Sequence, residues 1–281
     1  MDSKPRDGFV EANGVRLHYL EWGANSSPPL VMAHANGFLA WLWHPVAQRL
    51  TSRYRVIAYD MRGHGDSDKP PNAYHWRHLA DDLRSLLDAL DLRGLPLIGH
   101  SSGGAAAACL AGERQEYASR LCLIEPIILP PEVAASPAPR QAMAVAARKR
   151  RQVWDSPHAL IETYRRRETF ARWREDVLRL YAEHGLFRRE DGHYQLKCPG
   201  EIEAQVFENS ASLDVWGVLP EIRCPTLVMR GELTDDFMGS IFRQVAKRIP
   251  GAELLTVAGA GHLAPMERPD LVADEILRFL D

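Results

Sequence analysis

The sequence lacks the features of several specialised protein classes. Its 281 residues include four cysteines without paired spacing or adjacent histidines, so we expect reduced thiols and no metal site. No apolar run is long enough to span a membrane, and the first seven residues contain no hydrophobic segment of a secretory signal. The net charge of −3 gives no general reason to expect nucleic acid or a membrane as partner. We therefore expect a cytoplasmic protein acting on small molecules, and the oligomeric state stays open.

Short apolar segments alternate with amphipathic ones along most of the chain. An Asn13-Gly14 turn inside residues 9–19 predicts a hairpin, and leucines at helical spacing predict a helix over 79–90. Further strands are predicted at 29–34, 55–60, 95–98, 120–125, 225–230 and 253–257, and a last helix at 269–280. Strands that are apolar throughout and alternate with helices indicate an α/β fold, with a mostly parallel sheet covered by helices on both faces. The hairpin would form its antiparallel edge.

The region from 130 to 220 breaks this alternation. It has helical spacing at 140–154, 159–172 and 175–185 but no strand comparable to those on either side. We expect a core built from residues 1–129 and 221–281, with residues 130–220 inserted as a helical cap or lid. This insertion is basic, since residues 140–190 contain 13 arginines or lysines and seven acids. Such charges usually solvate helix faces, and the alternative is a positive funnel for anionic substrates.

The segment Gly99-His100-Ser101-Ser102-Gly103 carries the strongest chemical signal. It has the pattern G-x-S-x-G, and it lies between an apolar strand and the small-residue run Gly104-Ala105-Ala106-Ala107-Ala108. A serine on such a strand–turn–helix corner is held in a strained conformation with its hydroxyl exposed at the tip. The tight turn brings the flanking positions close together, which explains glycine at both. Ser101 is therefore a candidate nucleophile.

A serine hydroxyl needs a base to take its proton and an acid to orient that base. On this topology the three follow in the order serine, acid, histidine. His262 lies in a glycine-rich loop directly after the last predicted strand, and Asp235 and Asp236 follow the strand before it. Both loops lie at carboxyl ends of strands, where open α/β sheets place their sites.

Two further motifs complete a resemblance to the α/β-hydrolase-fold family over nearly the whole chain. His34-Ala35-Asn36-Gly37-Phe38 resembles the family's oxyanion loop, and Asp60-Met61-Arg62-Gly63-His64-Gly65-Asp66-Ser67 resembles its D-x-R-G-x-G-x-S turn. The resemblance implies that Ser101 is the nucleophile, His262 the base and Asp235 the acid. It also assigns the oxyanion hole to the backbone N–H groups of Asn36 and Ser102. No metal or organic cofactor is implied.

Among the three residues that the resemblance assigns to the triad, the acid is the one whose position departs from the family pattern. The family places an aspartate three residues after the glycine that ends the strand, and here that position holds Thr234. A loop longer by one residue favours Asp235. Asp236 is an alternative, and so is Glu125, because some relatives carry the acid after the strand that follows the elbow. Glu232 is a more remote possibility.

These residues predict a serine hydrolase that cleaves a carboxylic ester, thioester or lactone through an acyl-enzyme. Serine at position 101 argues against epoxide hydrolase and haloalkane dehalogenase chemistry, for which resembling proteins carry an aspartate there. A C–C bond hydrolase or a cofactor-free perhydrolase would use the same triad. A receptor on this fold, binding a ligand without turning it over, is the alternative from another class.

Overall fold

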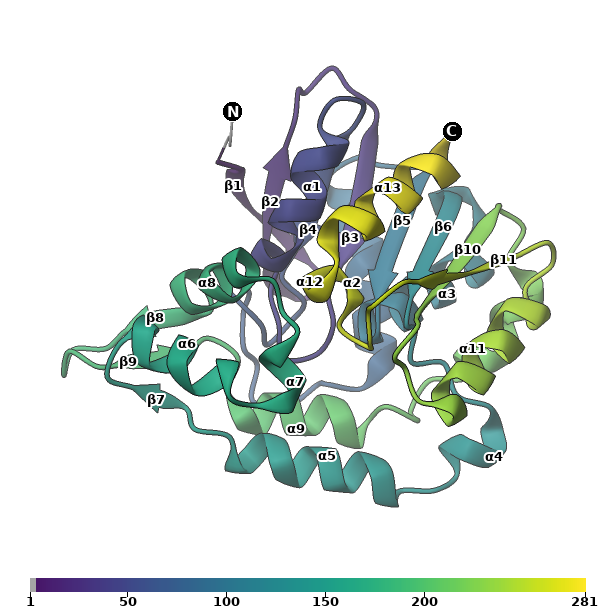
Figure 1. The fold of residues 1–281 in the computed structure, drawn as a ribbon. Helices are drawn as coiled ribbons and strands as arrows, with labels where there is room; N and C mark the ends of the chain where they lie inside the picture. The colour runs from purple at the N-terminus through teal and green to yellow at the C-terminus, as the bar shows by residue number, and fades with distance from the viewer. Residues whose placement is uncertain (1–3) are drawn as a thin grey trace.

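The structure is a computed structural model that describes residues 4–281. Residues 1–3, which begin the N-terminal segment considered above, lie outside the described residues. The core is an eight-stranded sheet in the order β1-β2-β4-β3-β5-β6-β10-β11 (Figure 1). The strands are β1 (Arg6–Ala12), β2 (Val15–Trp22), β3 (Pro29–Ala33), β4 (Arg55–Tyr59), β5 (Leu95–His100), β6 (Ala118–Ile124), β10 (Thr226–Gly231) and β11 (Glu253–Val257). Each strand predicted from the sequence is present.

The antiparallel edge forms as expected. Asn13 and Gly14 both have positive φ, 50° and 74°, which is the conformation that a two-residue hairpin turn requires. Strand β1 pairs antiparallel with β2, and β2 pairs antiparallel with β4. All remaining neighbours in the sheet are parallel. The parallel strands of this sheet are β3, β4, β5, β6, β10 and β11, and their carboxyl ends therefore lie along one edge.

Helices cover both faces of the sheet because successive strand residues point to opposite sides. In β3, Val31 and Ala33 belong to one apolar cluster, whereas Leu30 and Met32 belong to the other. The first cluster includes buried residues of α2 (Trp76–Ala89), α3 (Ser102–Glu113) and α11 (Asp236–Arg248); the second includes those of α1 (His44–Leu50) and α13 (Pro269–Leu280). Figure 1 shows α1 and α13 together on the near face of the sheet. This is the α/β fold that the sequence predicts.

Between β6 and β10 the chain forms seven helices and a small sheet. The helices are α4 (Pro131–Ala134), α5 (Ala138–Lys149), α6 (Pro157–Arg165), α7 (Glu168–Ala171), α8 (Glu175–His184), α9 (Gly200–Glu208) and α10 (Val215–Val218). The sheet, in the order β7-β9-β8, consists of β7 (Val153–Trp154), β8 (Leu186–Arg188) and β9 (Tyr194–Leu196). These strands are only two or three residues long, so none is comparable to the strands on either side, but the sequence does not predict the small sheet that they form.

Two predicted helices of this region differ from the observed ones. The helix predicted over 140–154 ends at Lys149, because Arg150 is extended and Trp154 pairs with Tyr194 in the small sheet. Trp154 is fully buried there against Tyr164, so packing overrides its helical spacing. The helix predicted over 159–172 is divided into α6 and α7.

The inserted segment packs on loops of the core. Helices α5 and α9 lie side by side in Figure 1, below the strands and away from the chain termini. A third apolar cluster joins Phe38 and Leu42, which follow β3, to Tyr164 and Tyr181 of the insertion and to Leu263 after β11. The insertion thus covers the edge at which β3 and β11 end. Of the helices in residues 4–281, none combines the length and apolar character needed to cross a membrane.

Candidate active site

Ser101 occupies the sharp corner between β5 and α3. Its φ is 56° and its ψ is −116°, a conformation that costs a non-glycine residue free energy and persists only where its surroundings enforce it. A Cβ atom on Gly99 would lie 2.5 Å from the Gly103 carbonyl oxygen, and one on Gly103 would lie 2.5 Å from the Ala33 carbonyl oxygen. Only glycine fits at either position. The sequence-based prediction for these two glycines is confirmed.

His262 connects Ser101 to a carboxylate. Its Nε2 lies 3.2 Å from Ser101 Oγ, and its Nδ1 lies 3.1 Å from Glu125 Oε2. An ionised carboxylate only accepts, so Nδ1 donates to Glu125 and Nε2 is left to accept from the serine hydroxyl. Ser101 and Glu125 are buried, whereas 41 % of the His262 side chain is exposed. The three side chains form one connected chain of contacts, from Ser101 through His262 to Glu125.

Glu125 is held firmly in this arrangement. It directly follows β6 with φ at 48°, and its backbone N–H donates to the Met229 carbonyl on the neighbouring strand. Its Oε1 accepts from the Gly231 N–H at 2.5 Å and from Thr234 Oγ1 at 2.6 Å. Together with the His262 contact, three hydrogen bonds therefore reach a carboxylate without solvent exposure. Donors of this kind fix the direction of a buried carboxylate.

Asp235 does not contact His262, and this corrects the sequence-based choice of acid. It is the N-cap of α11, and its Oδ1 accepts from the Met238 N–H at 3.0 Å. Both Asp235 and Asp236 are exposed. The family's usual acid position in the loop after β10 holds Thr234, and its hydroxyl donates a hydrogen bond to Glu125. The carboxylate on the histidine is therefore Glu125, which the sequence offered as an alternative.

A signal for Glu125 is present in the sequence. It is the acid that directly follows the strand after the elbow, and in a parallel sheet that strand is the neighbour of the elbow strand. The pairing of His100 with Ile124 places Glu125 beside Ser101 at the same edge. A threonine at the family's usual acid position is a second signal, because a hydroxyl there can donate to a carboxylate but cannot replace one.

The two residues predicted for the oxyanion hole follow β3 and β5, which are parallel neighbours in the sheet. Ser102 begins α3, and the first N–H groups of a helix have no partner within it. Asn36 lies in the loop after β3, and within residues 4–281 no hydrogen bond occupies its backbone N–H. Its side chain is used elsewhere, because Nδ2 donates to the Glu203 carbonyl oxygen at 3.0 Å. Both positions fit the predicted role, which stays a prediction.

Two buried histidines tie the oxyanion loop to the turn after β4. The Gly37 N–H donates to His64 Nε2 at 2.9 Å, and the Met61 N–H donates to His34 Nε2 at 3.0 Å. Each histidine uses Nδ1 as donor to a nearby carbonyl, that of Arg62 or of Ala35. Burial lowers the pKa of His34, and it lowers the pKa of His64 to about 3. Both rings therefore stay neutral and hold the loop at neutral pH.

The loop that carries His262 has its own supports. His100 Nε2 donates to the His262 carbonyl oxygen at 2.8 Å, and the Gly261 N–H donates to Glu267 Oε2 at 2.7 Å. Burial lowers the pKa of His100 to about 3, which leaves this ring neutral. Arg172 of the inserted segment forms an ion pair with the same Glu267 at 3.1 Å. The base is thus positioned from the elbow, from its own loop and from the insertion.

One group of side chains within residues 4–281 has the spacing of a metal site. Donor atoms of His18, Asp60 and Asp66 lie within 4.8 Å of one another. Their acceptors are already used, however: Asp60 Oδ2 contacts His18 Nδ1 at 2.7 Å and the Asp66 N–H at 2.9 Å, while Asp66 binds Lys197. Burial opposes protonation of His18, but Asp60 and Asp7 outweigh it and raise its pKa. We interpret this group as an internal brace of the D-x-R-G-x-G-x-S turn.

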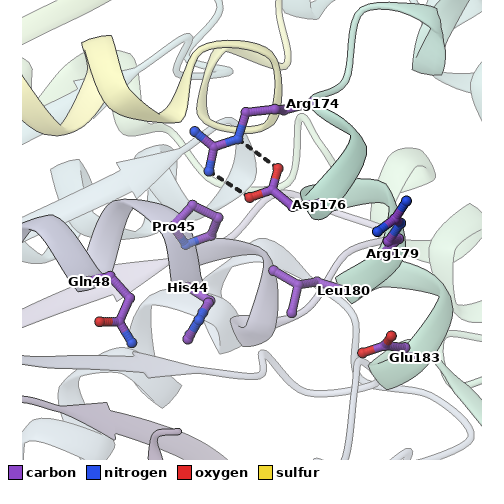
Figure 2. A pocket seen from close by; sticks show the side chains of 8 residues that line it. All are labelled: His44, Pro45, Gln48, Arg174, Asp176, Arg179, Leu180 and Glu183. Carbon is purple, nitrogen blue, oxygen red and sulfur yellow. Dashed lines mark hydrogen bonds and ion pairs between the residues drawn. The ribbon is translucent and has the colours of Figure 1, made fainter. Parts of the chain in front are cut away.

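A surface pocket of about 310 Å³ lies apart from the triad. Figure 2 shows its lining from α1 and α8, with Arg174 and Asp176 joined by two hydrogen bonds above Pro45. Its lining includes none of the three triad residues. The charged groups Arg174 and Asp176 in this pocket pair with each other, and the lining shows no arrangement of groups for a reaction. We therefore assign no function to this pocket.

Most arginines on the outside of the insertion are paired. Arg165 binds Glu162 and Glu175, Arg148 binds Glu201 and Glu208, and others follow the same pattern: Arg151 with Asp155, Arg174 with Asp176 and Asp270, Arg179 with Glu175, and Arg189 with Asp191. Exposed pairs of this kind contribute little individually. They favour the interpretation as solvated helix faces over that of a long-range funnel.

Comparison with known proteins agrees with this architecture. A soluble epoxide hydrolase from Corynebacterium sp. (strain C12) is 27 % identical over 95 % of this chain and 94 % of its own. The enol-lactonase structure from Burkholderia xenovorans LB400 has a TM-score of 0.76 at 26 % identity, over 97 % of this chain and 99 % of its own.

A crystal structure of E-2-(acetamidomethylene)succinate hydrolase superposes with a TM-score of 0.85 at 22 % identity, covering 99 % of both chains. At that identity the likeness concerns the fold. Residues 30–275 match the sequence model of the Alpha/beta hydrolase family. The match spans the elbow, the oxyanion loop and the loops that hold Glu125 and His262, and its relatives are named hydrolases. The chain therefore belongs to the Alpha/beta hydrolase family.

Proposed function

We propose that the protein is a serine hydrolase that cleaves a carboxylic ester, thioester or lactone through a covalent acyl-enzyme. The observation that carries the proposal is the position of His262, whose two ring nitrogens contact Ser101 Oγ and the buried carboxylate of Glu125. A histidine oriented in this way by an acid is the arrangement that activates a serine hydroxyl.

The first half of the reaction forms the acyl-enzyme. His262 Nε2 takes the proton of Ser101 as Oγ bonds to the substrate carbonyl carbon, and Glu125 stabilises the imidazolium. The negative charge on the former carbonyl oxygen is held by the N–H groups of Asn36 and Ser102, each such donor typically contributing about 3 kcal/mol. The tetrahedral intermediate then loses its alcohol or thiol, which leaves with the proton from His262.

The second half regenerates the enzyme. A water molecule gives a proton to His262 Nε2 and bonds to the acyl carbon, and the bond to Ser101 Oγ breaks as that proton passes to the serine. The product is a carboxylic acid. In a lactone the alcohol stays attached to the acyl group, so a single hydroxy acid is released.

The proposal gives the inserted segment the role of a cap. Residues 130–220 would form it, over a core of residues 1–129 and 221–281. The apolar cluster that joins Tyr164 and Tyr181 to Phe38 supports this, because it lies against the loop that carries Asn36. Side chains of the insertion would then select the substrate.

The serine at position 101 favours acyl hydrolysis over epoxide opening for this chain. One similar structure is an enol-lactonase, which acts on a lactone by name. The epoxide hydrolase relative is similar over nearly its whole length, but epoxide hydrolases of this fold use an aspartate at the elbow, where this chain has Ser101. C–C bond hydrolysis and perhydrolysis would require the same triad, and no particular contact in the site favours them.

A fluorophosphonate probe tests the nucleophile directly. The purified protein should be labelled at Ser101, and Ser101→Ala should abolish both labelling and hydrolysis of p-nitrophenyl esters. His262→Ala should be about as damaging, because nucleophile and base act as a unit. A folded protein that binds ligands but is not labelled would contradict the proposal and favour a receptor. A panel of p-nitrophenyl esters of increasing acyl length, with lactones added, would then identify the preferred acyl group.

A further inference from the structure

Arg150 brings a positive charge into the interior between the inserted segment and the core. It directly follows α5, and only 10 % of its side chain is exposed. Its Nη2 forms an ion pair with Glu203 Oε2 at 2.7 Å and donates to the Cys198 carbonyl oxygen at 3.2 Å. A guanidinium has five N–H donors, and Nε has no hydrogen-bond partner within residues 4–281. The cation is therefore held in place with donor capacity to spare.

The Tyr164 hydroxyl is close enough to this guanidinium to act on it electrostatically, and Tyr164 packs on further rings that carry buried donors. Within the part of the chain that the structure describes, the hydroxyl of Tyr164 and the indole N–H groups of Trp154 and Trp173 have no hydrogen-bond partner. The rings form one contiguous group: Trp154 and Tyr164 are 5.6 Å apart between centroids, and Tyr181 lies 5.8 Å from Tyr164 and 5.9 Å from Trp173. Buried polar groups are nearly always satisfied, by protein, by ordered water or by a ligand. Within residues 4–281 the carboxylate oxygen Glu203 Oε2 also lacks a hydrogen-bond partner, apart from its ion pair with Arg150, so four unpartnered donors stand against one acceptor and the group suits a ligand that accepts.

This donor-rich group lies against the loop proposed to stabilise the oxyanion. Asn36 Nδ2 donates to the Glu203 carbonyl oxygen at 3.0 Å, and a Cβ on Gly37 would lie 2.7 Å from Glu203 Oε1. The next residue, Phe38, packs on Trp173 with 5.3 Å between ring centroids. The residue that pairs with Arg150 is therefore in direct contact with Asn36, whose backbone N–H is the proposed oxyanion donor.

We infer that Arg150, with the neighbouring Tyr164, binds a carboxylate carried on the acyl part of the substrate, so that the enzyme acts on half-esters of dicarboxylic acids or on lactones with a carboxylate. The inference rests on the proposed function, which supplies the acyl chemistry. A guanidinium in a site with little water is the group best suited to a carboxylate, because its N–H groups match the two oxygens. Glu203 balances the charge of Arg150 when no substrate is bound.

The role of the positive charge of Arg150 in substrate preference can be tested by comparison with a second arginine of the same region. Arg148 lies two residues earlier, in the last turn of α5, where it pairs with Glu201 and Glu208 and remains 37 % exposed. The measured quantity is kcat/KM for p-nitrophenyl half-esters of succinate, glutarate and adipate, relative to neutral p-nitrophenyl esters of matched acyl length.

The wild type should prefer the half-ester of at least one of the three lengths. Arg150→Gln should lower that preference about 10- to 100-fold, the value of a charge-assisted hydrogen bond. Arg148→Gln should leave it unchanged. Glu203→Gln, which removes the competing negative charge, should raise it.

Loss of Arg150 alone leaves Glu203 buried and unpaired, which could prevent folding. The double variant Arg150→Gln with Glu203→Gln removes both charges, and its melting temperature and fluorophosphonate labelling report whether the site is intact. If this labelled variant loses activity equally on both kinds of ester, or if the wild type prefers neutral esters at all three lengths, the carboxylate subsite is overturned. Failure of the wild type to label at Ser101 would instead contradict the proposed function.

Discussion

The turns after β6 and β10 both carry acids at the same edge of the sheet, yet only one acid meets the histidine. The two strands are parallel neighbours, with Ile124 beside Met229. Glu125 is buried and has φ at 48°, whereas Asp235 is exposed and caps a helix. Position at a strand end therefore does not identify an acid. The backbone conformation that turns its side chain inward, and the donors that meet it there, decide which carboxylate orients the base.

The two turns cooperate rather than compete. The loop after β10 supplies the Gly231 N–H and the Thr234 hydroxyl to Glu125 Oε1, while Glu125 Oε2 remains for His262. The two oxygens of the Glu125 carboxylate therefore bind different partners. A buried carboxylate without such donors would be costly to keep ionised. The turn after β10 thus holds the Glu125 carboxylate in place, although its own Asp235 does not contact His262.

Glu125→Gln should have the largest effect and would test the comparison most directly. The amide N–H₂ can donate to His262 Nδ1, which then becomes an acceptor, so the ring proton moves to Nε2 and the nitrogen facing Ser101 can no longer accept. We expect kcat to fall by about 10³- to 10⁴-fold, as for the equivalent change in a serine protease triad. The rate of p-nitrophenyl ester hydrolysis measures it.

Asp235→Asn is the matched change on the other turn, and it should leave that rate within about twofold, since surface changes away from the site have small effects. The opposite ranking, with Asp235→Asn inactive and Glu125→Gln near normal, would restore the family's usual acid position. It would also require a different arrangement of the loop after β10 during turnover.

Thr234→Val should have an intermediate effect. It removes the hydroxyl that donates to Glu125 Oε1 at 2.6 Å and keeps a side chain of similar shape. The Gly231 N–H remains, so the carboxylate loses one of two supports. We expect kcat/KM to fall about 10-fold, which corresponds to one hydrogen bond to a charged acceptor. Thr234→Ser, which retains the hydroxyl, should keep most of the activity; an equal loss in both variants would mean that packing, not the hydrogen bond, is responsible.

The sequence predicts the sheet and the elbow well because local patterns decide them. Apolar strand runs, the Asn13-Gly14 turn and the glycines at 99 and 103 each follow from neighbouring residues. Ser101 and His262 were predicted from motifs and lie within hydrogen-bonding distance of each other. The choice of acid depends instead on φ at Glu125 and on donors more than 100 residues away, such as Thr234. The small sheet in the insertion likewise depends on the pairing of Trp154 with Tyr194.

Asp235→Ala should have the smallest effect and should change stability rather than catalysis. The Asp235 carboxylate accepts from the Met238 N–H and stands at the positive end of the α11 dipole. Its loss should lower the free energy of unfolding by about 1 kcal/mol, the usual value of an N-cap aspartate, as measured by urea denaturation. Asp236→Ala is the matched control: it removes a charge from the first turn but not the cap, so it should cost less. Activity per folded molecule should be unchanged in both variants, because neither carboxylate contacts His262. A drop in kcat for Asp235→Ala at unchanged stability would show that this aspartate reaches the histidine in solution, and the distinction between the two turns would then fail.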